Sequence, residues 1–205
     1  MSLGLEQAQA MVNNPSMFNQ ATFSNFIPSD EMSVTDKREM KNMAMKAGMT
    51  RALFKGFGSN PAELAVREIR PSIDLPTAFA AGDRWIFPAT PGAVAAFTTT
   101  VWINERVPVN TILVFYGVAL ESANPQISEI LFRSGPNGAG RTAGVFNVES
   151  CYTKMESDGY LSMPITYDDQ ETIYVQVINR IAVPAAGTIV TLRGYAIEPR
   201  RQQVS

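Results

Sequence analysis

From about residue 95 onward, apolar and polar side chains alternate with a period of two, which is typical of half-buried β-strands. Glycine and proline recur between the alternating stretches at spacings of roughly 8–14 residues, as in the turns of an antiparallel fold. No gap between them has room for the helical crossover of a parallel sheet. The pattern predicts seven strands, at residues 97–106, 111–120, 129–133, 144–150, 160–166, 172–181 and 188–197.

The first sixty residues lack this alternation and are predicted to form short helices and an extended arm. A helix is expected over residues 34–47. Ser33 is a preferred N-cap residue, and Asp36 places a carboxylate in the first turn, where the helix dipole favours one. Gly48 is expected to end this helix. A shorter helix is expected over residues 3–12, with marginal stability of its own.

Between these two helices, residues 16–28 combine phenylalanines with small polar residues and show no regular period. We interpret this segment as an extended arm that reaches a partner protein. Its candidate partner-binding residues are Phe18, Phe23 and Phe26.

Met40, Met43, Ala44 and Ala47 fall at helical spacing and give the second helix one apolar stripe. Methionine adapts to irregular or shared surfaces because its side chain is unbranched and polarisable. The stripe therefore has two interpretations: it packs on the β-domain of its own chain, or it docks on another protein. Under the second interpretation, Met40 and Met43 are candidate partner-binding residues.

The chain divides into four expected segments: an N-terminal arm with short helices (residues 1–60), a connector with an edge strand (61–91), a jelly-roll β-sandwich (92–199) and a tail (200–205). The connector contains a roughly alternating stretch that fits an edge strand, and a short helix beginning at Pro61 is the competing interpretation. The expected fold class is mainly β: an antiparallel β-sandwich or jelly roll with an N-terminal helical and extended arm.

Only 18% of the residues are charged, below the usual quarter, whereas 45% are hydrophobic. Low charge is expected of a surface covered by neighbouring subunits, and equally of an uncharged soluble β-domain. The formal net charge of -2 provides no field that would attract nucleic acid as the main partner. No uninterrupted apolar run approaches the length of a membrane span, so a soluble chain without a membrane partner is expected.

The chain contains no histidine, which excludes a histidine-based catalytic triad, a histidine-ligated metal and imidazole acid–base chemistry. Cys151 is the single cysteine, so an intrachain disulfide and a multi-cysteine metal site are excluded as well. Nothing in the pattern would activate its thiol, and we interpret Cys151 as structural or incidental. We expect no enzyme activity, no cofactor and no metal.

Two groups of carboxylates remain as candidate chemistry: Glu156 with Asp158, and Asp168 with Asp169 and Glu171. A glycosidase needs two carboxylates that face one another across a cleft. Both groups stand beside turn residues, where aspartate typically caps backbone amides. A calcium site in these loops is another alternative, although the EF-hand spacing is absent. Turn chemistry is the favoured interpretation.

The loop at residues 134–142 is rich in glycine and ends in Arg141 and Thr142. It lacks the P-loop spacing, and no helix is expected after it to cradle a phosphate. We expect a long hairpin loop whose exposed tip contacts a partner or ligand, with Arg141 as the candidate residue.

The stretches WINERVPVNTILVFYGVAL, GVFNVES, YLSMPITYDDQETIYVQVINR and TIVTLRGYAIEP resemble the single jelly-roll proteins of virions. The family that they resemble is that of the decoration, or cement, proteins on the capsids of tailed bacteriophages. The resemblance covers residues 92–199 and rests on strand order, the N-terminal arm and the low charge.

This resemblance implies a structural protein of the virion capsid that binds the major capsid protein and stabilises its lattice without catalysis. The low charge and the apolar faces of the strands lead us to expect a homotrimer, made soluble in the host cytoplasm. Two alternatives stay open: a jelly-roll protein that forms the shell itself, and a carbohydrate- or receptor-binding module with tryptophan stacked on sugar rings. Trp102 lies in an alternating strand and is expected in the core, so Trp85 is the better candidate for stacking.

Overall fold

The computed structural model of the chain describes residues 26–80, 82–89, 92–120, 126–140, 142–148 and 158–200. The strands are β1 (Phe26–Pro28), β2 (Leu64–Glu68), β3 (Ile86–Phe87), β4 (Thr99–Arg106), β5 (Ile112–Leu120), β6 (Ile127–Ser134), β7 (Thr142–Asn147), β8 (Asp158–Tyr167), β9 (Thr172–Asn179) and β10 (Thr188–Pro199). The α-helices are α2 (Val34–Phe54) and α3 (Pro71–Asp74), and the 3-10 helices are η2 (Ser29–Glu31), η3 (Pro61–Glu63) and η4 (Pro136–Gly138).

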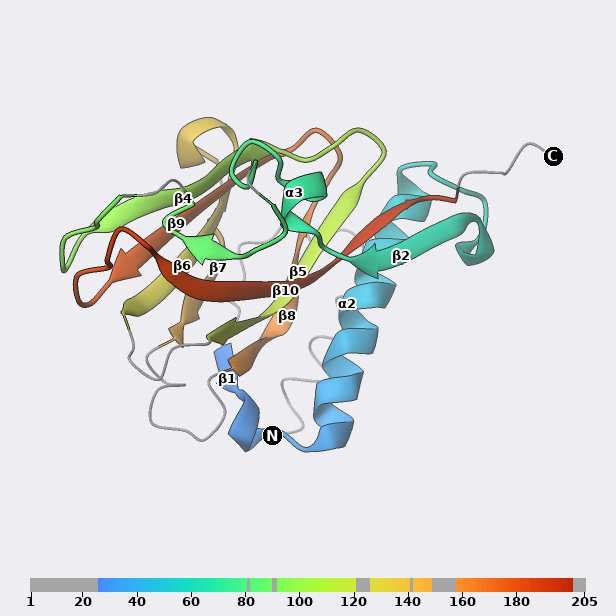
Figure 1. Ribbon diagram of the computed structural model, residues 1–205. Helices are drawn as coiled ribbons and strands as arrows, with labels where there is room; N and C mark the ends of the chain where they lie inside the picture. Colours follow the sequence, from blue (N-terminus) through green and yellow to red (C-terminus); the bar gives the residue numbers. More distant parts are fainter. Residues whose placement is uncertain are drawn as a thin grey trace.

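The strands form two antiparallel sheets that pack as a sandwich (Figure 1). The first sheet has the order β1-β8-β5-β10-β2, with β3 also paired to β10, and the second has the order β4-β9-β6-β7. From β3 to β10, every connection except the β6–β7 hairpin passes from one sheet to the other. This is the strand order of a jelly roll. The fold class expected from the sequence is confirmed.

All seven strands expected from the period-two pattern are present, as β4 to β10. The largest displacement of a strand end is in β7, which ends at Asn147 instead of residue 150. Strand β9 shows why the pattern is informative: Ile173, Val175 and Val177 are buried in the core, and the residues between them are half-exposed. Alternation of this kind results when one face of a strand lies on a core.

The strand that precedes β4 in the jelly roll is interrupted. Strand β2 pairs with the C-terminal part of β10 and β3 pairs with its N-terminal part, on the same side of β10. Between them the chain leaves the sheet as an excursion over residues 69–85, which contains α3. The amide of Ile69 and the carbonyl of Trp85 still bond to β10. The expected edge strand is therefore present as β2, and the helix that begins at Pro61 is limited to the three residues of η3 before it.

The excursion adds large side chains to the core between the sheets. Leu75, Phe79 and Trp85 are buried there with Trp102 from β4. The rings of Phe79, Trp85 and Trp102 meet edge to face, with centroids 5.2–6.1 Å apart. Trp102 is in the core as expected. The expectation that Trp85 is exposed is wrong, because the interrupted strand directs it inward, where only 7% of its surface stays accessible.

Helix α2 begins as the sequence indicates and ends later. The Ser33 hydroxyl accepts a hydrogen bond from the Asp36 amide and the Asp36 carboxylate accepts one from the Ser33 amide, which forms a capping box. The helix passes through Gly48 and continues to Phe54. A Cβ at Gly48 would lie 2.4 Å from Cδ1 of Ile197, so this glycine permits a close approach to the sheet instead of ending the helix.

The apolar stripe of α2 packs on the outer face of the first sheet. Met40 and Met43 are buried, at 4% and 7% exposure, against a second apolar cluster that includes Ile112 and Val114 of β5 and Ile197 of β10. Figure 1 shows α2 alongside these strands. The interpretation that Met40 and Met43 bind a partner is therefore corrected: the chain's own sheet covers them, and α2 belongs to the β-domain instead of a separate arm.

Residues 26–28 of the expected arm form β1, which pairs with β8 at the edge of the first sheet. Among the described residues, no helix is long and apolar enough to cross a membrane.

Candidate assembly surface

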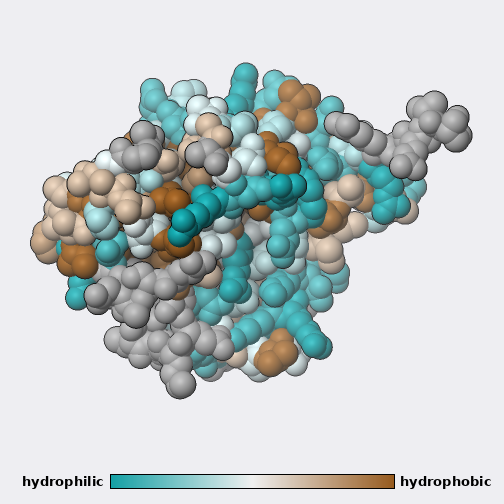
Figure 2. Space-filling model, in the orientation of Figure 1, coloured by the Kyte–Doolittle hydropathy of each residue, from teal (hydrophilic) through white to brown (hydrophobic). Residues whose placement is uncertain are grey.

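One end of the sandwich presents an uncharged, apolar surface made of two loops. We call this surface, residues 92–99 and 181–187, the apolar end. Its exposed apolar residues are Ala93, Ala95, Ala96 and Phe97 before β4, and Ile181, Ala182, Pro184, Ala185 and Ala186 after β9. No Asp, Glu, Lys or Arg occurs in residues 85–104 or 181–192. In Figure 2, tan and brown gather at the left, over the start of β4 and the β9–β10 turn of Figure 1.

Backbone hydrogen bonds join the two loops of the apolar end. The amides of Val94 and Val183 each donate to the other residue's carbonyl at 2.9 Å. Nearer the strands, the Phe97 amide donates to the Asn179 carbonyl at 3.0 Å, and the Asn179 amide donates to the Thr98 carbonyl at 3.1 Å. The loops therefore extend the β4–β9 pairing beyond the ends of both strands.

The side chain of Asn179 fastens the loops from inside and has no exposed surface. Its Nδ2 donates to the carbonyl oxygens of Ala95 and Ile181, one on each loop. The Thr98 hydroxyl lies 2.8 Å from both the Ala95 oxygen and Oδ1 of Asn179, and donates to one of them. A buried amide with both donors used restricts the loops to one arrangement.

Phe97 is the most exposed large apolar side chain among the described residues, at 83%. Its φ of 57° lies in the left-handed region, which a bulky residue enters at a cost of about 1–2 kcal/mol. Glycine or asparagine would hold this turn with less strain. A strained backbone that presents an aromatic ring to solvent is a feature of sites that bind.

Replacing Asn179 with alanine is expected to lower the free energy of unfolding by about 2 kcal/mol, because the carbonyls of Ala95 and Ile181 lose their donor. Amide hydrogen exchange across residues 92–99 and 181–187 should rise at the same time. The matched control is Asn104→Ala, since Asn104 is exposed and its one side-chain contact is 3.5 Å long. Equal stability of the two variants would contradict the fastening role of Asn179.

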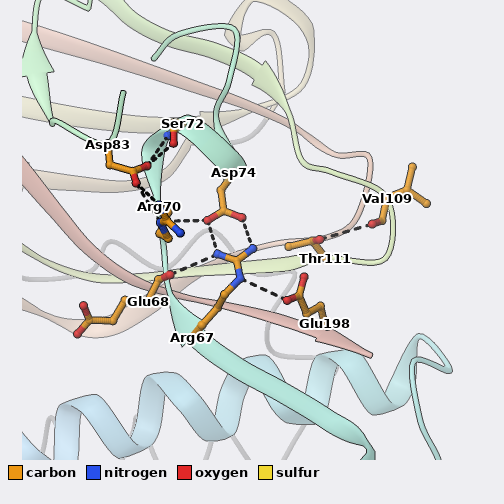
Figure 3. A network of polar contacts seen from close by, with 9 residues as sticks. All are labelled: Arg67, Glu68, Arg70, Ser72, Asp74, Asp83, Val109, Thr111 and Glu198. Carbon is orange, nitrogen blue, oxygen red and sulfur yellow. Dashed lines mark hydrogen bonds and ion pairs between the residues drawn. The ribbon is translucent and has the colours of Figure 1, made fainter. Parts of the chain in front are cut away.

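The excursion within the interrupted strand is held by a separate polar network, shown in Figure 3. Asp74, with no exposed surface, accepts two hydrogen bonds of 2.7 Å from the Arg67 guanidinium and one of 2.8 Å from the Arg70 amide. These bonds to Asp74 raise the pKa of Arg67. Arg67 also contacts Glu198 of β10 at 3.3 Å. The network ties the excursion to the sheet, and its charges are paired within the chain.

Two more carboxylates bind backbone amides of the excursion. Asp83 accepts from the hydroxyl and amide of Ser72 and from Arg70, and these bonds lower the pKa of Asp83. Glu105 of β4 accepts from the amides of Thr77 and Ala78. The acidic groups here stabilise turns of the backbone.

The β8–β9 turn is fastened to the end of α2 by ion pairs. Arg51 donates to Asp168 at 2.5 and 2.6 Å, and the Lys55 ammonium lies 3.2 Å from the same carboxylate. Burial alone would raise the pKa of Asp168, but the hydrogen bonds and charges of Arg51 and Lys55 outweigh it and lower that pKa. Asp168 therefore acts in a structural pair.

Replacing Asp168 with asparagine is expected to cost about 1–2 kcal/mol of unfolding free energy at neutral pH. Because the folded-state pKa of Asp168 is lowered, its contribution is present above the unfolded-state value of about 3.9 and is lost as the pH falls through the folded-state pKa. The stabilities of wild type and variant should therefore converge in acid. Asp169→Asn is the control, since Asp169 meets only Lys55 in this contact, at 3.7 Å. A difference independent of pH would contradict this assignment.

The other candidate residues named from the sequence are only partly placed. Phe18, Phe23 and Arg141 lie outside the described residues, as does Cys151. The backbone of Phe26 pairs with Leu161 of β8. The partner-binding roles of these phenylalanines and of Arg141 stay predictions.

The described part of the loop at residues 134–142 folds back on its own sheet. It contains η4, and Gly138 is buried. A Cβ on Gly138 would lie 2.5 Å from Cδ1 of Tyr174 in β9. This part of the loop is a packed connection on the outer face of the second sheet.

The carboxylate groups do not assemble into a site within the described residues. Asp158 pairs with Arg193 at 2.9 Å, and Asp168 pairs with Arg51 and Lys55. Glu156 lies outside the described residues. In the part of the chain that the structure describes, no group of three or more His, Cys, Asp or Glu side chains is placed to hold a metal ion.

No family model matches the chain, and no curated protein does. Among the solved structures that match part of the chain are two with low identity and low TM-score. The C-terminal CBM6 of LamC, a marine laminarinase from Zobellia galactanivorans, is 12% identical, covers 65% of this chain and 99% of its own, and gives a TM-score of 0.29. The VP2 subviral particle of infectious bursal disease virus is 10% identical, covers 65% of this chain and 32% of its own, and gives a TM-score of 0.30. The fold assignment rests on the strand order, and neither likeness decides a function.

The apolar end is the feature that the strand pattern alone did not identify. Residues 92–96 and 182–186 carry no period, because they are loops. The absence of charge from residues 85–104 and 181–192 is the signal that points to them. Contiguous exposed apolar residues are typical of interaction surfaces, so these two loops without charge are the candidate surface for contact with a partner.

Proposed function

We propose that this chain is a structural protein of a virion capsid, a jelly-roll subunit that decorates and stabilises the lattice of the major capsid protein without catalysis. The observation that carries the proposal is the apolar end, where Phe97 and Ile181 stand exposed at 83% and 42% in a surface without charge. Exposed apolar patches of this kind are typical of protein interaction sites.

The physical logic of such a subunit is the burial of apolar surface at several points. Each buried square ångström of apolar surface contributes about 25 cal/mol. A single small contact is weak, because association costs translational and rotational freedom. Repetition in a homo-oligomer, expected to be a trimer, raises the effective concentration of each contact on a lattice. The apolar end is proposed to join copies of the chain, and the N-terminal segment with Phe18 and Phe23 is the proposed contact with the capsid protein.

The alternative of a carbohydrate-binding module draws no support from the tryptophans. Trp85 and Trp102 are both buried in the core, at 7% and 3% exposure, and neither can stack on a sugar without unfolding of the excursion. The observations therefore favour a protein partner.

Quantitative mass spectrometry of virus particles produced by cells that express this chain tests the proposal. We expect the chain in a fixed ratio to the major capsid protein, and release of the chain should lower the temperature at which the particles break. Absence of the chain from washed particles would overturn the proposal. Binding to a glycan array by the same preparation would then favour the carbohydrate-binding alternative. A chain that builds closed shells on its own would be the shell protein itself.

A further inference from the structure

We propose that the apolar end binds the apolar ends of other copies of this chain around a rotation axis. The inference rests on the proposed assembly role and adds the place where the copies meet. It follows from three properties of the surface: the absence of charge, the contrast between one large side chain and many small ones, and the rigid attachment of its loops.

The absence of charge favours a second copy as the partner. Around a rotation axis the same residues of each copy come together, so any charge near the axis meets its own kind. A charged patch there would bury like charges or leave them unpaired, at a large cost. The apolar end has no charged residue in either loop, and its nearest charged neighbour in sequence is Arg180 at the border. The two loops can therefore meet those of a copy without burying a charged side chain of their own.

The side chains of the apolar end also suit a contact with themselves. Phe97 projects as the one large ring among alanines, and the small residues of both loops permit close approach of a neighbouring backbone. A ring of Phe97 from one copy can lie over the alanines of the next. Aromatic anchors surrounded by small apolar contacts are where interface energy concentrates.

The rigid attachment of the loops lowers the entropic cost of binding. Asn179 and the Val94–Val183 bridge hold the loops in one arrangement before any partner arrives. Preorganisation of this kind improves affinity without adding contact area. The hydrogen bond from the Phe97 amide to the Asn179 carbonyl helps to hold the positive φ of Phe97 and so fixes the direction of its ring.

The size of the apolar end determines how strong an association between copies we expect. Its exposed apolar residues number four in one loop and five in the other, whereas a stable interface uses roughly 20–30 residues a side. The contact alone is therefore expected to be weak in free solution, with a dissociation constant of about 10 µM or higher. A hydrophobic contact should not weaken when sodium chloride rises from about 0.1 to 1 M, whereas an ionic contact would.

Sedimentation equilibrium of the full chain over a range of concentrations tests the inference. Phe97→Glu places a charge at the centre of the contact, and we expect it to weaken association at least tenfold. The matched control is Val109→Glu in the β4–β5 turn, at the opposite end of β4, where Val109 is 63% exposed. This control should associate like the wild type. Phe97→Gly serves as a second variant, because it removes the ring and relieves the positive φ, and it should also weaken association.

Two results would overturn the inference: a wild-type chain that stays monomeric at several hundred micromolar, or association that Phe97→Glu and Val109→Glu affect equally. Circular dichroism shows whether the variants are folded. If Phe97→Glu does not fold, the association measured with Phe97→Gly tests the inference in its place. Failure of the proposed function is a separate outcome. If the chain associates through Phe97 but is absent from particles, this inference holds and the proposed virion role is wrong. If the chain is monomeric but present in particles, the virion role holds and this inference is wrong.

Discussion

Replacing Met43 with aspartate is expected to remove most of the stability of the fold. Met43 is 7% exposed and lies between α2 and the first sheet, where the aspartate would find a dry apolar surface. The lost apolar burial and the buried unpaired charge together should cost about 4–6 kcal/mol. This is a large share of the 5–15 kcal/mol or so that a typical domain has. Urea denaturation followed by circular dichroism measures it.

Asn42→Asp is the matched control for this variant. It adds the same charge to the same helix at the neighbouring position, but Asn42 is exposed. We expect a change within about 0.5 kcal/mol. If Met43→Asp were as stable as Asn42→Asp, the helix would not pack on the sheet in solution, and the partner-docking interpretation of the methionine stripe would return.

Replacing Arg67 with methionine is expected to cost about 3–5 kcal/mol, because it leaves the Asp74 carboxylate buried without its cation. The methionine keeps much of the aliphatic volume, so the loss reports the ion pair and not a cavity. The excursion at residues 69–85 should loosen first, since Asp74 also holds the Arg70 amide. Thermal unfolding gives the stability, and the fluorescence of Trp85 and Trp102 reports the packing of the excursion.

Arg70→Met is the control for the Arg67 variant. Arg70 pairs with Asp83 on the surface, where the Arg70 side chain is 57% exposed, so the loss should stay below about 1 kcal/mol. Equal losses for the two arginines would show that Asp74 does not depend on Arg67. A normal tryptophan spectrum in an unstable Arg67→Met chain would contradict the link between this pair and the core.

The β-sandwich could be predicted from the sequence because most strands bury one face. Apolar side chains then occur at every second position along the strand. Strand β5 is an instructive exception. Its residues are buried on both sides: Leu113 and Phe115 face the other sheet, and Ile112 and Val114 face α2. The continuous apolar run of β5 results from burial of both faces, one against the other sheet and one against α2. A search for alternation alone does not detect this second contact.

The extent and role of α2 could not be read from local pattern. Glycine commonly ends a helix, and the sequence alone predicts that this helix ends at Gly48. At this position the glycine instead allows the helix to approach Ile197 and Val114. Whether Met40 and Met43 face their own sheet or a partner depends on contacts between residues far apart in the chain. No spacing within the helix distinguishes the two.

The candidate surface was predicted only in part. Low overall charge suggested a covered surface, but its location came from the pairing of β4 with β9, which brings residues 92–99 beside residues 181–187. Asn179 offered no sequence signal, because a buried asparagine at the end of a strand resembles a turn residue. The loop context of Trp85 likewise suggests exposure, but the Trp85 carbonyl accepts a hydrogen bond from Val190 of β10, and its side chain is buried in the core.

The most direct measurement of the central claim, that the apolar end is buried between copies of this chain, is photo-crosslinking from position 97. The variant Phe97→p-benzoylphenylalanine keeps an aromatic ring and reacts with whatever lies against it. Irradiation of purified chain near its association concentration should give covalent products at multiples of 22.4 kDa, with attachment points in residues 92–99 or 181–187 of the second copy. The same group at Val109 should leave the chain uncrosslinked. Products only from position 109, or none from position 97 at concentrations where the chain is oligomeric, would contradict the claim.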